Sequence, residues 1–244
     1  MKAIGGYPIV SIFKGLNVIV NEALFNFEEN GLTIRAVDPA NISMVEIEAP
    51  PTAFDVYTID EGVKIGLDVD RIIDFLKIAK KRDTIEIEYE KEKNKFKVRV
   101  GNIQYQTSII PPENIKEPKT PNLQFDVKVT IDAGEFKRAI QCISKVKSES
   151  VIFRCDDIGL TIEANTDIDR IEFTISEIEA IEFNKGNAKS VYSMEYLKDL
   201  IKIAEKGDTV TIEFGNDLPL SLTYSIDEKV TIRYFLAPRI EAEI

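Results

Sequence analysis

Basic residues recur at helical spacing in four short segments of this 244-residue chain. In the last segment Lys198, Lys202 and Lys206 are spaced i, i+4 and i+8, which places them in one row along a helix. Lysine carries a flexible point charge that suits contact with phosphate groups whatever the base sequence. The twelve basic residues concerned lie on or just beyond four predicted helices: Lys14, Lys77, Lys80, Lys81, Arg82, Lys137, Arg138, Lys145, Lys147, Lys198, Lys202 and Lys206.

Any one of these segments also fits an ordinary solvated helix face, because acidic residues could pair with the lysines. These acids are Asp74, Glu195, Asp199 and Glu205. The net charge of the chain is −11, and twelve of its 31 basic residues fall in the four segments, which leaves the remaining surface strongly acidic. The recurrence therefore favours a basic surface on an acidic body. No pattern of a recognition helix, zinc finger or aromatic RNA platform is present, so base readout is not expected.

Carboxylates offer a second candidate chemistry. Asp156-Asp157, Asp167 and Asp169 could supply oxygen ligands to a divalent cation such as Mg²⁺, as in a metal-dependent enzyme. They fall in predicted loops without a signature spacing, so surface turns are the favoured interpretation. The chain has no histidine, which removes Ser-His-Asp and Cys-His activation of a nucleophile. We therefore expect no catalytic residues, no metal, no cofactor and no enzymatic activity.

Composition places the chain among ordinary globular proteins, with 44% apolar and 30% charged residues. No apolar run approaches the roughly 20 residues that span a bilayer, so no membrane association is expected. Cys142 and Cys155 show neither metal spacing nor a disulfide framework, and each is predicted to be a small core residue. These features predict a reducing, cytoplasmic location.

The chain contains two copies of one pattern. Leu76–Glu88 and Ile201–Glu213 are identical at eight of 13 positions, and two shorter matches occur in the same order. The shorter matches pair Gly31–Ile34 with Gly159–Ile162, and Phe13-Lys14 with Phe136-Lys137. The offsets of 125, 128 and 123 residues are nearly equal, which indicates two similar domains, each of a usual size for a domain.

Four prolines mark the boundary between the copies. Pro111, Pro112, Pro118 and Pro121 block both helix and inner strand, so residues 111–122 are predicted to form an extended surface linker. The predicted domains are therefore residues 1–110 and 123–244.

Each half reads as helix, strands, helix, strands. Helices are predicted from Pro8, from Asp68 or Asp70 to about Lys81, over Gly134–Val146, and from a Ser193 cap to about Lys206 before Gly207. Alternating apolar residues predict strands over 23–27, 32–37, 43–48, 84–90, 95–100, 104–110, 123–131, 151–155, 160–164, 170–176, 209–214, 221–225 and 231–236. The fold class is therefore α+β, with antiparallel sheets and two helices in each domain.

Three segments carry a resemblance to a known family. They are Leu32–Val45 (LTIRAVDPANISMV), Asp132–Lys137 (DAGEFK) and Leu236–Ile240 (LAPRI). With the length and the duplication, they make the chain similar to sliding clamps of the proliferating cell nuclear antigen family, archaeal type. The resemblance covers essentially the whole chain.

The resemblance implies a ring of three subunits that encircles double-stranded DNA, with helices lining the hole and sheets forming the outer wall. Such a ring is a processivity factor: it tethers DNA polymerase and other replication and repair enzymes, is opened by a clamp loader, and breaks no bond itself. The basic helices would then face the DNA. A homotrimer is favoured, although the single lysine of the first helix leaves a heterotrimer possible. An alternative is a duplicated-domain adaptor of the checkpoint type.

The resemblance also implies a partner-peptide pocket and a subunit interface. The pocket would comprise Val37, Asn41, Ile42, Met44, Ile115, Pro118, Pro219, Phe235, Leu236, Ala237, Pro238 and Ile240. The linker departs from the family pattern, because Thr120 stands where an aliphatic residue commonly precedes a proline. The interface would pair residues 102–110 with residues 170–176 of a neighbour, through Gln104, Tyr105, Gln106, Thr107, Ile109, Arg170, Ile171, Glu172, Phe173 and Thr174.

Overall fold

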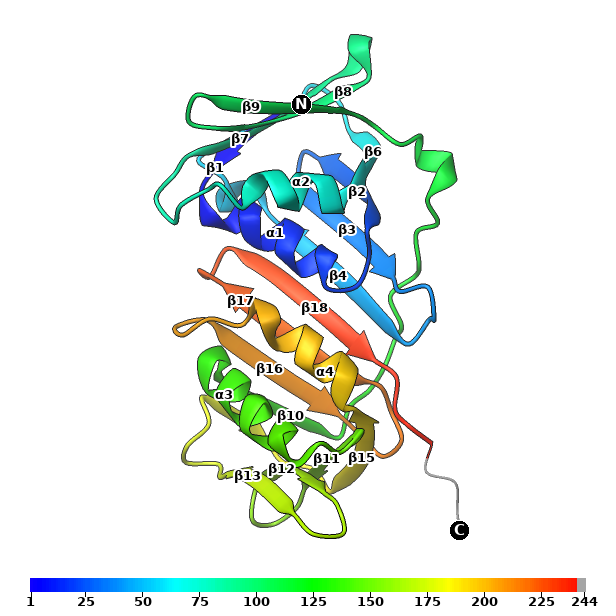
Figure 1. Ribbon diagram of the computed structural model, residues 1–244, viewed down its shortest axis with the longest axis vertical. Helices are drawn as coiled ribbons and strands as arrows, with labels where there is room; N and C mark the ends of the chain where they lie inside the picture. The colour runs from blue at the N-terminus through cyan, green and yellow to red at the C-terminus, as the bar shows by residue number, and fades with distance from the viewer. Residues whose placement is uncertain (241–244) are drawn as a thin grey trace. The chain divides into compact units, whose positions relative to one another are not determined.

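The computed structural model describes residues 1–240, which form two compact units. The first comprises Met1–Thr120 with Ile226–Ile232, and the second comprises Pro121–Ser225 with residues from Arg233 onward. Figure 1 shows their helices and strands, with labels where there is room.

The first unit holds two helices and two groups of antiparallel strands. Its strands form the orders β5-β1-β7-β8-β9 and β6-β2-β3-β4. The elements are β1 (Lys2–Gly5), α1 (Tyr7–Asn17), β2 (Glu22–Glu28), β3 (Gly31–Val37), β4 (Ser43–Ala49), β5 (Val56–Thr58), β6 (Val63–Asp68), α2 (Val69–Leu76), β7 (Ile85–Glu90), β8 (Lys95–Val100) and β9 (Ile103–Ser108). Short 3₁₀ turns lie at Pro51–Ala53, Lys91–Lys93 and Pro112–Asn114.

The second unit repeats this plan element for element, when β17 and β18 are counted whole with it. Its orders are β14-β10-β16-β17-β18 and β15-β11-β12-β13. The elements are β10 (Val127–Asp132), α3 (Ala133–Ile143), β11 (Ser150–Cys155), β12 (Leu160–Asn165), β13 (Arg170–Ile175), β14 (Glu182–Asn184), β15 (Ala188–Ser193), α4 (Met194–Leu200), β16 (Thr209–Phe214), β17 (Leu220–Ile226) and β18 (Val230–Leu236). Short 3₁₀ turns follow α3 at Ser144–Val146 and α4 at Ile201–Ile203. The matching orders confirm the predicted duplication and the α+β class.

The repeated Gly-Leu-Thr-Ile motif has a steric cause. Gly31 begins β3 and Gly159 directly precedes the equivalent strand, β12; their φ angles of +128° and +147° lie in a region that L side chains rarely adopt. A Cβ at Gly31 would lie 2.4 Å from the Ala49 carbonyl oxygen, and one at Gly159 would lie 2.3 Å from that of Ile175. Glycine is therefore required twice, at corresponding positions of the two units.

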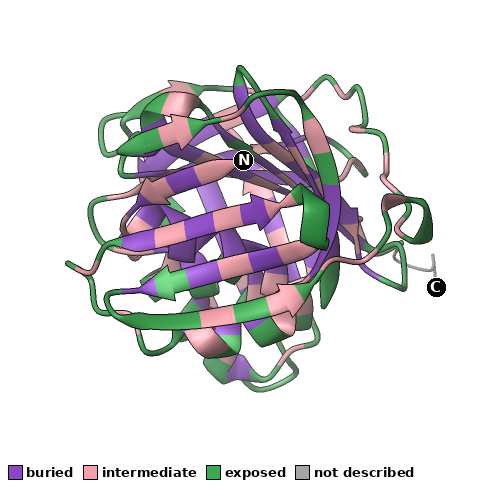
Figure 2. Ribbon diagram, turned by 90° about the horizontal axis from the view of Figure 1, so that it is seen from above, coloured by how far each residue is buried: buried purple, intermediate pink, exposed green. Residues whose placement is uncertain are grey.

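Alternation along the strands builds the core of each unit. Buried residues alternate with more exposed ones along several strands, which the bands of colour in Figure 2 display. In the first unit Phe13 of α1 stacks on Phe25 of β2 with ring centres 5.3 Å apart. In the second, Phe153 meets Tyr192 and Phe214 edge to face, with ring centres 5.4 and 6.0 Å away. The first contact fixes α1 against β2, and the other two join β11 to β15 and β16.

Three of the predicted helix ends were wrong. Helix α2 ends at Leu76 rather than near Lys81, because the chain turns where Asp83 Oδ2 accepts a hydrogen bond from the Lys80 backbone N–H at 2.9 Å. Helix α4 ends at Leu200, and its 3₁₀ extension stops at Ile203 rather than Lys206. Helix α3 ends at Ile143, three residues before Val146. The Asp68 cap is confirmed, whereas Ser193 sits at the N-cap position without a side-chain capping bond.

Several strands escaped the sequence prediction or differ from it. The strands that were not predicted are β1, β5, β6, β14 and β15. β6 contains Gly66, where a Cβ would lie 2.6 Å from Ile115 Cδ1 and 2.7 Å from the Ile110 carbonyl oxygen. β10 begins at Val127 rather than Leu123.

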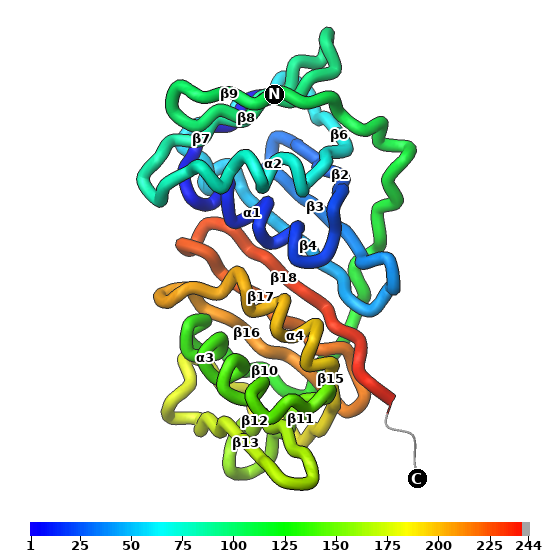
Figure 3. Tube along the Cα trace, viewed as in Figure 1, coloured from blue at the N-terminus to red at the C-terminus, as the bar shows by residue number. Residues whose placement is uncertain are grey.

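The linker can be followed in green in Figure 3. It contacts the first unit through Glu117, which pairs with Arg35 and Lys64 at 3.3 and 2.9 Å.

Candidate functional site

The two helices of each unit lie side by side (Figure 1), and the predicted basic residues lie on them or in the segments that directly follow them. In the first unit Lys14 lies on α1 and Lys77 directly follows α2, while Lys80, Lys81 and Arg82 belong to the turn before β7. All five side chains are exposed. The basic charge of this unit is therefore carried mainly by the end of α2 and the segment after it, not by helix faces alone.

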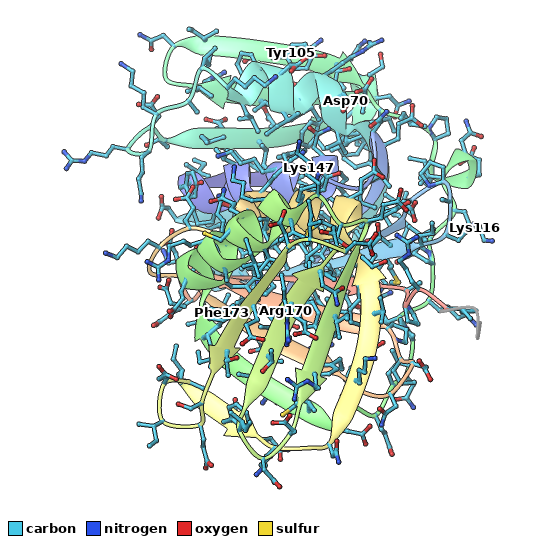
Figure 4. The ribbon with its side chains drawn as sticks, turned by 60° about the horizontal axis from the view of Figure 1, so that its bottom comes forward. Asp70, Tyr105, Lys116, Lys147, Arg170 and Phe173 are labelled. Carbon is cyan, nitrogen blue, oxygen red and sulfur yellow. The ribbon has the colours of Figure 1, made fainter. Side chains whose placement is uncertain are left out.

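In the second unit the basic residues belong to both helices. Those of α3 and the turn that follows it are Lys137, Arg138, Lys145 and Lys147, and those of α4 and beyond are Lys198, Lys202 and Lys206. All are exposed except Lys137, which is half-buried. Figure 4 labels Lys147 at the end of the α3 segment.

Lys137 differs from the expectation that its ammonium group points into solvent. Its Nζ donates hydrogen bonds to the carbonyl oxygens of Lys202 and Ala204 at 3.3 and 2.9 Å. Carbonyl groups at the end of a helix lack intrahelical partners, so this ammonium group closes the end of the α4 segment. Lys137 therefore has a structural role within the second unit.

Acidic neighbours pair with some of the exposed basic residues. Lys77 contacts Asp74 at 2.6 Å and Lys202 contacts Asp199 at 2.6 Å, both at i,i+3 spacing and both highly exposed. Exposed pairs of this kind contribute about 0–1 kcal/mol, so another anionic group can replace the carboxylate as partner at little cost. The pairing predicted for Asp74 and Asp199 is confirmed, and it leaves these lysines available.

Sequence reasoning missed Tyr7, which contacts two of the basic residues. Lys14 Nζ lies 5.0 Å and Lys81 Nζ 5.8 Å from the centre of its ring. The only signal in the sequence is the position of the aromatic residue, two helical turns before Lys14 at i,i+7.

Two of the strands at sheet edges, β9 and β13, lack a further partner strand among residues 1–240. β9 closes the order β5-β1-β7-β8-β9, and β13 closes β15-β11-β12-β13. These are the strands predicted at the subunit interface. β9 ends at Ser108, so Ile109 and Ile110, which were predicted to belong to this strand, lie outside it. Figure 4 labels Tyr105 on β9, and Arg170 and Phe173 on β13.

A hollow of about 290 Å³ lies between α3 and β13. Its apolar lining is Ala139, Cys142, Ile143, Ile171 and Phe173, and its charged lining is Glu135, Arg138 and Glu172. Cys142 is therefore exposed and not the core residue predicted, whereas Cys155 is buried, which raises the pKa of its thiol. In the first unit Phe75 stacks on Tyr105 of β9 with ring centres 5.5 Å apart.

The predicted partner-peptide residues of the first unit surround one turn and the linker. The Asp38 carboxylate shapes the turn by accepting hydrogen bonds from the Ile42 and Ser43 backbone N–H groups, both at 2.7 Å. Asn41 adopts the left-handed region with φ +56°, and Ile42 is 38% exposed, while Met44 is buried. Val37 ends β3 just before this turn, and Ile115 and Pro118 are half-buried on the linker.

Thr120, the departure from the family pattern, makes a polar contact instead of an apolar one. Its hydroxyl donates to Glu46 Oε1 at 2.7 Å, which ties the linker to β4. Ile115 lies against Gly66 of β6.

The predicted partner-peptide residues of the second unit lie at the end of β18 and just after it, except Pro219, which directly precedes β17. Phe235 and Leu236 are buried, Pro219, Ala237 and Pro238 are half-buried, and Ile240 is 95% exposed. The Arg239 backbone N–H donates to the Val191 carbonyl oxygen at 2.7 Å, which holds the segment against β15.

Two of the four carboxylates considered as metal ligands, those of Asp156 and Asp157, make other contacts. Asp156 pairs with Arg154 and accepts from the Ile158 N–H at 2.9 Å, and Asp157 pairs with Lys185 at 2.8 Å, a contact that lowers the pKa of Asp157. Within residues 1–240 no group of three or more acidic or cysteine side chains is arranged to hold a metal ion. Over the same residues no helix has the length and apolar character needed to cross a membrane.

Comparison with known proteins matches both units. The model of the proliferating cell nuclear antigen N-terminal domain matches residues 8–108, and that of the C-terminal domain matches residues 119–239. A DNA polymerase sliding clamp of Archaeoglobus fulgidus is 42% identical over 98% of this chain and 97% of its own length. One of Methanococcoides burtonii is 33% identical, with 98% of both chains covered.

Solved structures agree. A. fulgidus PCNA bound to the C-terminal region of FEN-1 superimposes with a TM-score of 0.96, at 41% identity and 99% coverage of both chains. A chain of the PCNA2–PCNA3 complex of Sulfolobus tokodaii gives 0.88 at 28% identity, covering 99% of this chain and 100% of its own. On the evidence of both units, the chain belongs to the proliferating cell nuclear antigen family.

Proposed function

We propose that this chain is a DNA polymerase sliding clamp, three copies of which close into a ring around double-stranded DNA. The observation that carries the proposal is the duplicated unit, in which the helices and the segments that follow them hold twelve basic residues on a chain of net charge −11. Contacts to phosphates hold a duplex without selecting a sequence. The ring works at the chromosome inside the cell as a processivity factor and docking platform for replication and repair enzymes, and breaks no bond itself.

Reversing exposed basic charges tests this proposal. Lys77, Lys81, Lys145, Lys198 and Lys202 are changed together to Glu, and Lys137 is left intact because it closes the end of the α4 segment. A control variant changes five exposed lysines outside the helices to Glu: Lys93, Lys116, Lys119, Lys189 and Lys229. Both carry the same net charge. Stimulation of a cognate polymerase on primed circular DNA should be lost in the first variant and largely kept in the control.

Equal stimulation by both variants, with the trimer intact, would contradict the placement of the helices toward DNA. Stimulation that is the same on circular and on short open linear DNA would instead indicate an adaptor that does not enclose the duplex.

Subunits are proposed to join by pairing β9 of one copy with β13 of the next. Unpaired strand edges promote association, and a head-to-tail contact closes into a ring when its rotation divides a full turn. The apolar hollow beside β13 suits the Phe75–Tyr105 pair that lies beside β9. The contributing residues are Gln104, Tyr105, Gln106, Thr107 and Ile109 on one side, and Arg170, Ile171, Glu172, Phe173 and Thr174 on the other.

Light scattering checks the assembly. A homotrimer has three times the chain mass of 27.6 kDa, and Tyr105→Ala should shift it toward monomer. A wild-type chain that stays monomeric would point to non-identical partner subunits.

Partner enzymes are proposed to dock through short peptides that contact Ile42 in the first unit and Pro238 and Ile240 in the second. Ile42→Ala should weaken binding of a peptide from the C-terminal region of a FEN-1 about tenfold, because apolar anchors dominate such contacts. Ile168→Ala is the matched control, because it removes an 89% exposed isoleucine that is not among the predicted partner-peptide residues. Isothermal titration calorimetry measures both, and equal affinities would contradict the assignment.

A further inference from the structure

Tyr7 begins α1 and brings together lysines from two segments of the first unit. Lys14 Nζ donates to the Tyr7 hydroxyl at 3.2 Å and lies 5.0 Å from the ring centre. Lys81 Nζ, from the turn between α2 and β7, lies 5.8 Å from the same centre. Two ammonium groups separated by 67 positions in the sequence thus share one aromatic ring.

The ring is fixed better than the lysines it meets. Tyr7 is half-buried, its carbonyl oxygen accepts from the Ser11 hydroxyl at 3.2 Å, and Pro8 restrains the backbone directly after it. Lys14 and Lys81 are exposed side chains with many rotamers. The ring attracts both cations, so it favours the rotamers that hold each ammonium group near Tyr7.

We propose that Tyr7 is a positioning residue that gathers Lys14 and Lys81 into a two-lysine site for a backbone phosphate of duplex DNA. The assignment rests on the proposed clamp function. The two unesterified oxygens of a phosphodiester can accept hydrogen bonds from both ammonium groups at once. Helix α1 carries one lysine where its counterpart α3 carries Lys137 and Arg138, and the site would let α1 act with a distant lysine.

The test uses the full-length trimer and a 30-base-pair duplex of arbitrary sequence as the probe. Tyr7→Leu removes the ring, Tyr7→Phe removes only the hydroxyl, and Lys14→Ala with Lys81→Ala removes the cations. Affinity is measured against salt concentration, and the lysine side-chain methylene resonances report whether the ring lies over them. Lys91→Ala with Lys93→Ala, two lysines of the same unit outside both helices, is the control.

Tyr7→Leu should abolish the ring-induced shifts of both lysines and weaken duplex binding about two- to fivefold, the range expected for a lost cation–π contact at an exposed site. The double lysine variant removes two cations from each site. The slope of log affinity against log salt concentration should therefore become shallower by about 2 for each site that contacts the duplex. In that background Tyr7→Leu should have no further effect. Tyr7→Phe should keep the shift of Lys81 and give an intermediate affinity, which provides a test even if the leucine variant does not fold.

Unchanged or tighter binding by folded Tyr7→Leu, alongside weaker binding by the double lysine variant, would overturn the role of Tyr7 and leave the clamp function standing. Equal binding by the double lysine variant and the control would overturn the site. A wild-type trimer that neither binds duplex nor stimulates polymerase would overturn the proposed function and the site with it.

Discussion

The two units share every element of their plan but differ in how they cap helices, pack aromatic rings and present charge. The capped helix is the second one in the first unit, where Asp68 accepts from the Arg71 N–H at 3.0 Å, and the first one in the second unit, where Asp132 accepts from Glu135 at 2.8 Å. The rings stack in the first unit and meet edge to face in the second. Strand order and the two left-handed glycines are common to both, so the backbone plan constrains the duplicated unit more strongly than its side chains do.

Alkaline pH should separate the two units most strongly. Burial raises the pKa of Tyr57 in the first unit to about 12, and it also raises those of Tyr192, Tyr224 and Tyr234 in the second. A raised pKa means that folding favours the protonated phenol. The contribution of each phenol to the free energy of unfolding is therefore complete below pH 10 and is lost as the pH rises toward the folded-state pKa. Three such groups should make the second unit open first above pH 10.

Hydrogen exchange of peptides from each unit, measured from pH 9 to 11 with correction for intrinsic rates, checks this expectation. Earlier opening of the first unit would contradict it. Tyr192→Phe, which removes one ionisable hydroxyl from the second unit, should bring the pH values at which the two units open closer together.

Large-to-small changes in equivalent core positions should have the next largest effect. Phe13 of α1 and Phe136 of α3 are both fully buried, and Phe→Ala typically costs about 3–5 kcal/mol of unfolding free energy. Each change should loosen the amides of its own unit far more than those of the other, because each unit has its own core. Urea denaturation measures the loss of unfolding free energy, and hydrogen exchange shows which amides lose protection. Equal loss of protection in both units would contradict the expectation and show that they unfold together.

Cap removal should give the smallest effects and sharpen the contrast between helices. Asp68→Ala and Asp132→Ala should each cost about 1 kcal/mol, whereas Ser193→Ala should cost close to nothing because its side chain makes no capping bond. Asp132→Asn retains an acceptor and serves as the control. Thermal unfolding ranks the variants by their loss of unfolding free energy. An equal loss for Ser193→Ala and Asp132→Ala would contradict the assigned caps.

Much of the fold could be predicted because its signals are local. The strand Thr209–Phe214 was predicted to the residue from alternation, and the start of α1 and the Asp68 cap came from side chains within one turn of the helix. β6 could not be predicted, because Gly66 breaks the pattern for a reason that lies at Ile110 and Ile115.

The candidate site divides in the same way. The sequence by itself determined which residues are basic, that the domain occurs twice, and where helices and most strands occur, since spacing and caps act over a few residues. Only the tertiary structure decided that Lys137 serves carbonyl groups more than 60 positions away, that Cys142 faces a hollow beside β13, and that Tyr7 unites Lys14 with Lys81. These contacts join residues distant in the chain, and packing alone sets which of them meet.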